Sequence, residues 1–336
     1  MERIGIIGGG AWGTALGQTL ARAGRDVVLW AHGAETVAAI NGAHENKLFL
    51  PGVALDPALR ATPDLAEAAS SEAVLLVVPA QHLRAIAVRL APALAPGVPA
   101  VICAKGIELA TGALMTEVAA DALPHAPLAV LSGPTFAAEV ARGLPTALTL
   151  ATADAALGQR LLAALGSRNL RPYLSDDPVG AEIGGAVKNV EAIACGIVVG
   201  RGLGENARAS VITRGLAEMV RLAQAKGGRP ETLMGLSGLG DLTLTCTSPQ
   251  SRNYSLGLAI GAGQALAAIL GQRRSIAEGV QSAPATVALA ARVGVELPIA
   301  AAVAAVLDGS AGIDAAIDRL LARPFRAENG GSSLKS

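Results

Sequence analysis

The chain has 336 residues, of which 51% are hydrophobic and 16% are charged, with 27 basic and 27 acidic side chains. This length and apolar content are sufficient for two domains with large cores. A formal net charge of zero argues against nucleic acid as a partner, because binding a phosphate backbone requires a strong basic excess. A small local cluster of basic groups that holds one phosphate is still compatible with this balance.

The sequence also argues against membrane insertion and export. Its longest apolar runs, residues 257–271 and 297–307, fall short of the ~18 uninterrupted apolar residues that a membrane-spanning helix needs. A strand is expected from Arg3, which leaves no room for a signal peptide. The cysteines are odd in number and widely spaced: Cys103, Cys195 and Cys246. This set predicts neither a disulfide framework nor a metal site and suits a reducing, cytoplasmic compartment.

The first half of the chain alternates short β-like runs with Ala/Leu-rich helical stretches. Strands are expected at 3–7, 27–30, 73–78, 100–104, 128–131 and 146–150, with helical stretches that include 81–92 and 113–122. Several of these runs are apolar without alternation, as in parallel strands that are covered on both faces. The pattern predicts a doubly wound α/β domain with a mostly parallel sheet over residues 1–178.

The pattern changes near residues 170–180, where prolines, aspartates and a glycine indicate a domain boundary. After this point strand signals nearly vanish. Long Ala-rich segments with helical spacing occupy residues 181–225, 256–271, 281–293 and 298–321. We therefore expect an all-α domain over 179–326. The last residues, 327–336, are polar and rich in Gly and Ser, which is typical of a disordered tail.

A glycine-rich motif, GGGAWG at residues 8–13, follows the first expected strand and opens a helical stretch at 14–23. In this context Gly8 makes the tight turn, Gly10 lets the backbone approach a pyrophosphate, and Gly13 allows close helix–sheet packing. The N-terminus of the helix then favours anionic phosphates. The motif predicts a dinucleotide-binding Rossmann domain, and the alternative is a glycine turn with a purely structural role.

The end of the second expected strand lacks the acidic residue that commonly binds the adenosine ribose in NAD-binding proteins. The strand ends at Trp30, Ala31 and His32, and Glu35 is expected on the next helix. Without a carboxylate there is no repulsion against a 2′-phosphate, and His32 can favour one. We infer that NADP is accepted and NADPH preferred to NADH. Alternatively, His32 is an ordinary loop histidine.

Two polar clusters follow expected strands of the sheet, at the edge where ligands bind in open α/β domains. Lys105, in CAKGIE, follows one strand, and its alternative role is that of a surface lysine. In SGPTFAAEV, which follows another strand, Gly133 and the free amides of a helix N-terminus can make an anion or carbonyl site. Ser132 or Thr135 is alternatively a helix cap.

A third cluster lies in the second half, at GLGD and QSRNYS. Arg252, beside Ser251 and Asn253, provides cationic and neutral donors of the kind that hold a phosphate monoester. Asp241, in a glycine-rich loop, can accept hydrogen bonds from substrate hydroxyls or from a lysine. Considered separately, each of these residues is also compatible with ordinary loop structure.

Lys188 stands in the small, apolar stretch GGAVKNVEAIACG, residues 184–196, which is typical of a buried helix. A buried ammonium is costly unless it is paired or used. Small neighbours on its helical face leave room for a ligand, and Glu191, one turn on, can orient the ammonium or form a helix salt bridge. The alternative is that Lys188 extends to solvent. A separate apolar stripe packs inward: Ile183, Val187, Val190 and Ala194.

Taken together, these segments resemble the bacterial NAD(P)-dependent glycerol-3-phosphate dehydrogenases. The resemblance is carried, in order, by GGGAWGTAL, CAKGIE, SGPTFA, the long segment AVKNVEAIACGIVVGRGLGENARASVITRGLAEM at 186–219, LSGLGDLTLTC, SRN and AEG. It covers nearly the whole chain. It implies a Rossmann domain joined to a helical domain, with the active site between them. It also implies reversible reduction of dihydroxyacetone phosphate to sn-glycerol 3-phosphate for phospholipid synthesis, in a homodimer.

The resemblance assigns roles to individual residues. Lys188 would be the general acid/base and Lys105 a second cation that lowers its pKa and touches substrate and cofactor. The substrate would be bound by Lys105, Gly133, Thr135, Lys188, Asp241, Ser251, Arg252 and Asn253. The cofactor would be bound by Gly8, Gly10, Ala11, Trp12, Gly13, His32, Lys105, Ala137, Arg252, Ile276 and Glu278. No metal is implied, because the hydride chemistry belongs to the nicotinamide.

Two other functions are compatible with part of this pattern. A related two-domain dehydrogenase of the 3-hydroxyacid or 6-phosphogluconate type would also use a lysine but would act on a carboxylate, and the SRN and SGLGD segments argue against it. A non-catalytic NADP-binding sensor would need neither Lys105 nor Lys188.

Overall fold

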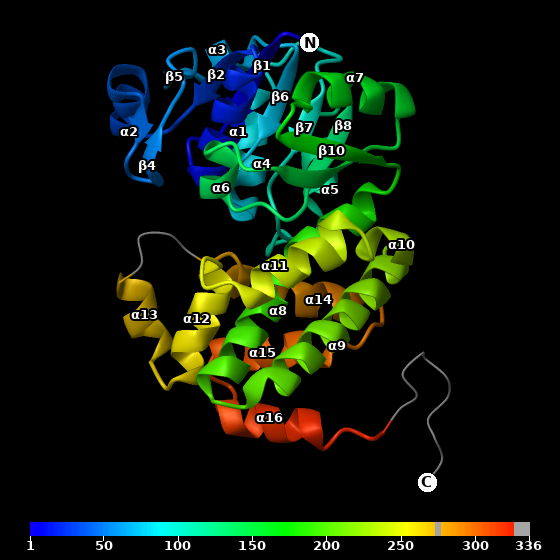
Figure 1. Cartoon of the computed structure of the whole chain (residues 1–336). Helices are drawn as coiled ribbons and strands as arrows, with labels where there is room; N and C mark the ends of the chain where they lie inside the picture. Colours follow the sequence, from blue (N-terminus) through cyan, green and yellow to red (C-terminus); the bar gives the residue numbers. More distant parts are fainter. Residues whose placement is uncertain (273–276, 326–336) are drawn as a thin grey trace.

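The structure, a computed structural model, describes residues 1–272 and 277–325. Within these ranges an α/β half and a helical half lie one above the other (Figure 1). Ile276 and the tail predicted at 327–336 lie outside the described residues. The α/β half is built on a single eight-stranded sheet, which confirms the predicted fold class.

The sheet has the strand order β10-β9-β8-β7-β6-β1-β2-β5. Its strands are β1 (Arg3–Ile7), β2 (Asp26–Trp30), β5 (Arg60–Thr62), β6 (Ala73–Leu76), β7 (Ala100–Ile102), β8 (Leu128–Ser132), β9 (Thr146–Ala151) and β10 (Leu170–Ser175). All neighbours pair in parallel except β8 and β9, which are antiparallel. The order changes direction beside β1, where β2 lies on one side and β6 on the other, and ligands bind at such a point in open α/β sheets.

Helices cover both faces of this sheet, as expected for strands that are apolar on both sides. They are α1 (Ala11–Arg22), α2 (Ala34–Ala38), α3 (Leu65–Ala69), α4 (Leu83–Leu90), α5 (Met115–Ala122), α6 (Ala137–Ala141) and α7 (Ala155–Leu165). A small antiparallel hairpin of β3 (Glu45–Asn46) and β4 (Leu50–Ala54) lies outside the sheet. The apolar strand residues pack against these helices in one core on each face of the sheet.

Strand β10 was not among the expected strands, because residues 170–180 were interpreted only as a boundary. It is the edge strand of the sheet, and its burial alternates rather than being continuous. Pro172 is tolerated there because an edge strand does not need every backbone N–H for pairing. Helix α8 begins directly afterwards at Pro178, with the Asp177 carboxylate accepting from Gly180 N at 2.9 Å as its N-cap.

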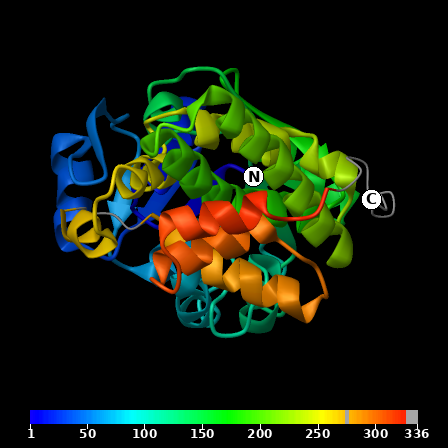
Figure 2. The ribbon, with the colours of Figure 1, turned by 90° about the horizontal axis from the view of Figure 1, so that it is seen from below.

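The helical half contains α8 (Pro178–Gly200), α9 (Gly204–Ala225), α10 (Pro230–Leu233), α11 (Asp241–Thr247), α12 (Arg252–Gly261), α13 (Leu266–Gln272), α14 (Gly279–Arg292), α15 (Pro298–Leu307) and α16 (Ile313–Leu321). The stretches predicted at 181–225 and 298–321 are each divided into two helices by a short turn. Seen from below, α16 lies across the outer side of the helical half (Figure 2).

Helix α8 runs through the middle of this half and is almost entirely buried. Its glycines let α12 approach closely: a Cβ on Gly196 would lie 2.2 Å from Tyr254 O, and one on Gly257 would lie 2.1 Å from Ile193 O. By length and composition α8 is long enough to cross a membrane, although Glu182, Lys188 and Glu191 interrupt its apolar sequence. However, 89% of its most apolar window is buried inside the protein, as in the core helix of a globular fold.

The two halves are joined by polar contacts near the start of α5. The buried carboxylate of Glu182, on α8, accepts from Thr116 N at 2.8 Å and from Thr116 Oγ1 at 2.5 Å. It thereby satisfies a free N–H in the first turn of α5. Lys226 Nζ lies 2.7 Å from Glu117 Oε1 on the same helix. The Glu182 bonds tie α8, which carries Lys188, to α5 of the α/β half, and the Lys226 ion pair ties the end of α9 to the same helix.

Candidate active site

Lys188 is buried, with 7% of its surface exposed, so it does not extend to solvent. It lies in the middle of α8, and its Nζ is 2.6 Å from Oδ1 of Asp241, which is 1% exposed. Asp241 is the first residue of α11, so it is helical rather than in a loop. The turn Leu236–Gly240, directly before α11, lies close against α8, since a Cβ on Gly184 of α8 would lie 2.3 Å from Ser237 O.

Thr245 completes the surroundings of the ammonium and was not predicted. Lys188 Nζ donates to Thr245 Oγ1 at 3.0 Å, and Thr245 Oγ1 in turn donates to Asp241 O at 2.6 Å. Thr245 follows Asp241 by four residues, and such positions share one face of a helix. A helix start assigned to Asp241 would therefore have identified this hydroxyl from the sequence.

Lys105 reaches the same carboxylate from the sheet. It follows β7, and its Nζ lies 2.7 Å from Asp241 Oδ2 and 3.0 Å from Gly133 O, at the end of β8. Each oxygen of Asp241 thus holds one lysine. Gly185 on α8 leaves space for this arrangement, because a Cβ there would lie 3.3 Å from Lys105 Cγ. The carboxyl ends of two strands and two helices converge on one acidic side chain.

The pKa of Lys188 is lowered from 10.5 to about 8. Burial is the largest cause, since it disfavours the charged form, and the positive charge of Lys105 acts in the same direction. Asp241 opposes both by stabilising the ammonium. The result is a lysine able to exchange a proton near neutral pH, which is the property required of a general acid/base.

Glu278 is half-buried and lies just before α14. Burial raises the pKa of this carboxyl, while the charges of Arg252, Lys188 and Lys105 lower it. Three cations from separate elements are therefore close enough to Glu278 to act on its ionisation. Such a concentration of positive charge favours an anionic ligand.

The predicted phosphate residues lie at the start of α12. Ser251 is buried, and its Oγ accepts from Tyr254 N at 3.2 Å as the N-cap of the helix. Asn253 is also buried, with Nδ2 donating to Asn189 Oδ1 at 2.8 Å and Oδ1 accepting from Gly279 N at 2.9 Å. Arg252 is exposed between them. The helix start is thus fixed to α8 and α14, and the hydroxyl of Ser251 is still able to donate.

Two expectations about local roles are wrong. Glu191 does not orient Lys188: it is fully buried, and neither carboxylate oxygen has a hydrogen-bond partner among the described residues. Burial first, and then Glu218, raises the pKa of Glu191. Nor do Ser132 or Thr135 cap a helix, because α6 begins at Ala137 after Phe136. Thr135 Oγ1 instead donates to Gly133 O at 3.2 Å.

The glycine turn has the geometry that its motif predicts. Gly8 has φ +132°, and a Cβ there would lie 2.6 Å from Val77 O. A Cβ on Gly13 would lie 1.9 Å from Gly8 O, so α1 can approach the turn only with glycine at this position. By contrast, no heavy atom lies within 4 Å of a Cβ position on Gly10, where open space remains.

Ala11 and Trp12 begin α1 directly after this turn. The indole Nε1 of Trp12 is buried without a hydrogen-bond partner among the described residues. Open space at Gly10, directly before the N-terminus of α1, fits a dinucleotide phosphate. His32, by contrast, is exposed after β2, with its ring 6.4 Å from that of Trp30. Glu35 lies on α2 as expected.

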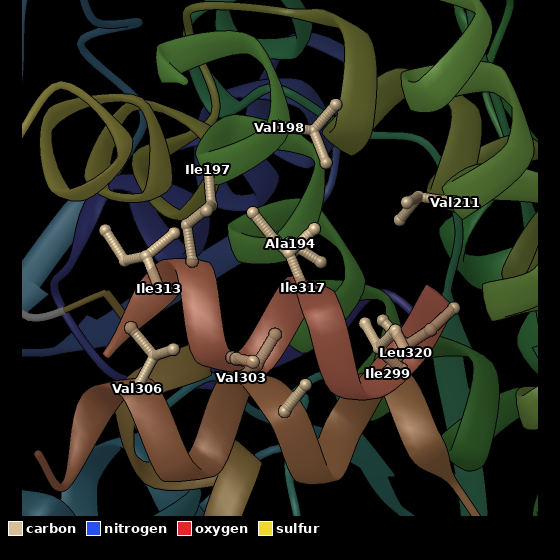
Figure 3. A pocket seen from close by; sticks show the side chains of 12 residues that line it. Ala194, Ile197, Val198, Val211, Ile299, Val303, Val306, Ile313, Ile317 and Leu320 are labelled. Carbon is tan, nitrogen blue, oxygen red and sulfur yellow. The ribbon is translucent and has the colours of Figure 1, made fainter. Parts of the chain in front are cut away.

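An apolar cavity of about 60 Å³ lies away from this cluster, between α8, α9, α15 and α16. Figure 3 shows aliphatic side chains from these helices pointing into it, among them Ala194, Val303 and Ile317. Its aliphatic lining offers no polar side chain for orienting a substrate. The candidate site is therefore the lysine–aspartate cluster, which supplies the polar and charged groups that this cavity lacks.

The fold and these features define a two-domain nicotinamide-dependent oxidoreductase: a glycine turn on a doubly wound sheet, joined to a helical half that carries a lysine with a lowered pKa. Models of NAD-dependent glycerol-3-phosphate dehydrogenase match the chain twice, the N-terminal model over residues 3–158 and the C-terminal model over 177–318. The chain belongs to the NAD-dependent glycerol-3-phosphate dehydrogenase family.

Individual relatives agree with this membership. A glycerol-3-phosphate dehydrogenase [NAD(P)+] of Rhodospirillum rubrum is 61% identical over 334 residues, which cover 99% of this chain and 96% of the relative. One of Parvibaculum lavamentivorans is 59% identical, with 97% and 98% covered. The crystal structure of a glycerol-3-phosphate dehydrogenase from Coxiella burnetii has a TM-score of 0.92 at 38% identity and covers 96% of this chain and 99% of its own.

Proposed function

We propose that this protein catalyses the reversible reduction of dihydroxyacetone phosphate to sn-glycerol 3-phosphate with NAD(P)H, and so supplies glycerophospholipid synthesis. The observation that carries the proposal is the buried Lys188, which has a pKa of about 8 and is held by Asp241, in a chain related over nearly its whole length to enzymes of this name. A sensor that only binds cofactor has no need of such a lysine.

In the proposed mechanism, the nicotinamide cofactor supplies the hydride for reduction and accepts it in oxidation. Lys188 Nζ gives a proton to the carbonyl oxygen of the substrate and takes it back in the reverse direction. Asp241 directs the ammonium, and Lys105 both lowers its pKa and contributes positive charge for the developing alkoxide. Lys188 and Asp241 are buried and the side chain of Lys105 is only 14% exposed, which limits the access of water to the proton transfer.

Around these groups, binding is proposed to involve the start of α12 and the ends of β7 and β8. Arg252, with Ser251 and Asn253, holds the substrate phosphate through charge-assisted bonds. Gly133 and Thr135 contact the three-carbon chain. Gly8, Gly10, Gly13 and the residues Ala11 and Trp12 hold the cofactor pyrophosphate, and Ala137 and Glu278 line the remainder of the cofactor site.

NADPH is proposed as the preferred cofactor. The end of β2 offers no carboxylate to the adenosine ribose, because Glu35 belongs to α2, and His32 is exposed at this position. An exposed imidazole at this position favours a 2′-phosphate over a free hydroxyl pair.

The proposal also covers the domain boundary, the cellular compartment and the oligomeric state of the protein. We place the domain boundary between residues 178 and 179, after the last strand of the sheet and at the start of α8. Cys103, Cys195 and Cys246 are free and buried, which suits a reducing cytoplasm. A homodimer is proposed from the family resemblance, and sedimentation of the purified protein tests it.

The activity is tested by following the nicotinamide absorbance with dihydroxyacetone phosphate, using NADPH and NADH in parallel. Rapid oxidation is expected with both cofactors and faster with NADPH. Unphosphorylated dihydroxyacetone is the matched control for the phosphate site and is expected to react poorly. Cofactor binding without oxidation would support the sensor, and turnover with 6-phosphogluconate and NADP would support the related hydroxyacid dehydrogenases.

A further inference from the structure

Asn46, which was not among the predicted site residues, joins the glycine turn to the hairpin of β3 and β4. Its side chain is 1% exposed, and each of its polar groups has a partner. Nδ2 donates to Gly9 O at 3.0 Å and to Thr14 Oγ1 at 2.8 Å, and Oδ1 accepts from Phe49 N at 3.3 Å. The carboxamide is therefore fixed in one orientation.

The bond to Gly9 O determines how one peptide plane of the turn is oriented. In a trans peptide the carbonyl of Gly9 and the N–H of Gly10 point in opposite directions. Because Asn46 holds the carbonyl on the hairpin side, the Gly10 N–H faces the other side. The space beside Gly10 is open, since no heavy atom lies within 4 Å of a Cβ position there.

The Gly9–Gly10 peptide is also restricted by close packing of Gly9 against the residue that follows β2. A Cβ on Gly9 would lie 2.5 Å from Cβ of Ala31, at the end of β2, so this segment is pressed against the sheet. Thr14, which shares the carboxamide of Asn46, belongs to the first turn of α1, and its N–H bonds to Gly10 O at 2.9 Å. Asn46 thus acts on both ends of the turn.

We propose that Asn46 is a positioning residue for the cofactor, which keeps the Gly10 amide directed at the pyrophosphate. This inference rests on the proposed function, which places the pyrophosphate over the glycine turn. An amide that donates to a phosphate oxygen forms a charge-assisted hydrogen bond, stronger than a neutral one. A peptide released by loss of Asn46 can rotate, and it then presents the partial negative charge of the Gly9 carbonyl to the same phosphate.

Gln18 provides a matched control, because its side chain also joins α1 to the hairpin of β3 and β4. It is fully buried on α1, its Nε2 donates to Ala54 O at 3.1 Å, and its Oε1 accepts from Asp56 N at 2.6 Å. It ties α1 to the far end of the hairpin without contacting the turn. Loss of Gln18 therefore removes comparable bonds to the backbone but leaves the Gly9–Gly10 peptide held.

The test compares full-length Asn46→Ala, Gln18→Ala and unchanged protein, with NADPH titrated by its fluorescence. Asn46→Ala is expected to raise the Kd for NADPH by about tenfold, as expected for one charge-assisted bond. At saturating NADPH its kcat and its KM for dihydroxyacetone phosphate are expected to stay unchanged. Gln18→Ala is expected to lower the melting temperature but to leave the Kd unchanged.

An unchanged Kd in folded Asn46→Ala would overturn the proposal and reduce Asn46 to a structural residue. If Asn46→Ala does not fold, Asn46→Asp is measured in the same way, because it keeps the shape and the acceptor for Phe49 N but loses both donated bonds. An unchanged Kd for NADPH in Asn46→Asp would also overturn the proposal. Failure of the unchanged protein to bind NADPH would instead reject the proposed function.

Discussion

Lys188 and Asp241 lie 2.6 Å apart between helices that start 63 residues apart in the chain (178 and 241), and both are buried. The second oxygen of Asp241 binds Lys105 at 2.7 Å, so one carboxylate serves two ammonium groups. A single negative charge does not balance two positive ones. The remaining positive charge is available to an anionic substrate and to the alkoxide that forms during reduction.

The pH dependence of the reaction follows from the pKa of Lys188, which burial lowers to about 8. Reduction requires the ammonium, so kcat/KM for dihydroxyacetone phosphate should be constant below this pKa and fall as the pH rises through it. Oxidation of glycerol 3-phosphate requires the neutral amine and should show the opposite dependence. Initial rates in both directions across this pH range test the prediction, and two profiles with the same direction would contradict it.

Replacing Asp241 by Asn should move this inflection. Asp241 raises the pKa of Lys188, while burial and Lys105 lower it, so its loss lets the pKa fall below about 8. In Asp241→Asn the reduction profile should therefore turn down at lower pH, and kcat should decrease by about 10²-fold or more because the ammonium is no longer directed. An inflection at the same pH as in the unchanged protein would show that Asp241 does not control Lys188.

Glu182 should make the stability of the protein depend on pH. Burial raises its pKa from 4.5 to about 7, against the hydrogen bonds from Thr116. Because the pKa of Glu182 is higher in the folded than in the unfolded protein, its contribution to the free energy of unfolding depends on pH. The contribution is fully present below about pH 4.5, the unfolded value, and is lost as the pH rises through about 7. When the pH is raised from 5.5 to 8.5, the melting temperature of Glu182→Gln should decrease less than that of the unchanged protein. An equal decrease in melting temperature in both proteins would contradict this prediction.

Filling the apolar cavity should stabilise the helical half. Ala194 of α8 faces this cavity, and Ala194→Val adds two methyl groups to a space of about 60 Å³ (Figure 3). The expected gain in the free energy of unfolding is about 1 kcal/mol after the lower helix propensity of valine is subtracted. Ala301→Val, on the exposed side of α15, is the matched control and should be slightly destabilising. Denaturant unfolding of both variants provides the comparison, and a destabilised Ala194→Val would show that no usable space exists.

Local motifs allowed much of the site to be predicted. The turn at Gly8–Gly13 could be identified because glycine is needed at each motif position for a separate steric reason, so that the spacing of the glycines is diagnostic. Lys105 and Gly133 were expected together because both follow strands whose ends meet at one edge of the sheet. The sequence indicated that Asp241 can accept a hydrogen bond from a lysine, but it did not identify Lys188 as that lysine, because nothing in the local pattern relates α8 to α11.

Other features depend on tertiary contacts that have no local signal. Strand β10 was missed because, as an edge strand with alternating burial and Pro172, it lacks the continuous apolar run of the central strands. Glu191 was misassigned because helical spacing places it one turn from Lys188 but does not reveal that it faces Gly215 on α9, where a Cβ would lie 2.5 Å from its Oε2. Asn46 lies in the first strand of a short hairpin, and only the fold brings it to Gly9.

The most direct test of the account is single-turnover reduction by Lys188→Met, with NADPH binding and melting temperature measured on the same sample. Methionine keeps the unbranched apolar stem of lysine but lacks the ammonium and has no proton to give. The account predicts a rate of hydride transfer lower by about 10³-fold, with unchanged affinity for NADPH and an unfolding transition close to that of the unchanged protein. Normal turnover by this variant would show that another group protonates the substrate and that Lys188 is not the general acid.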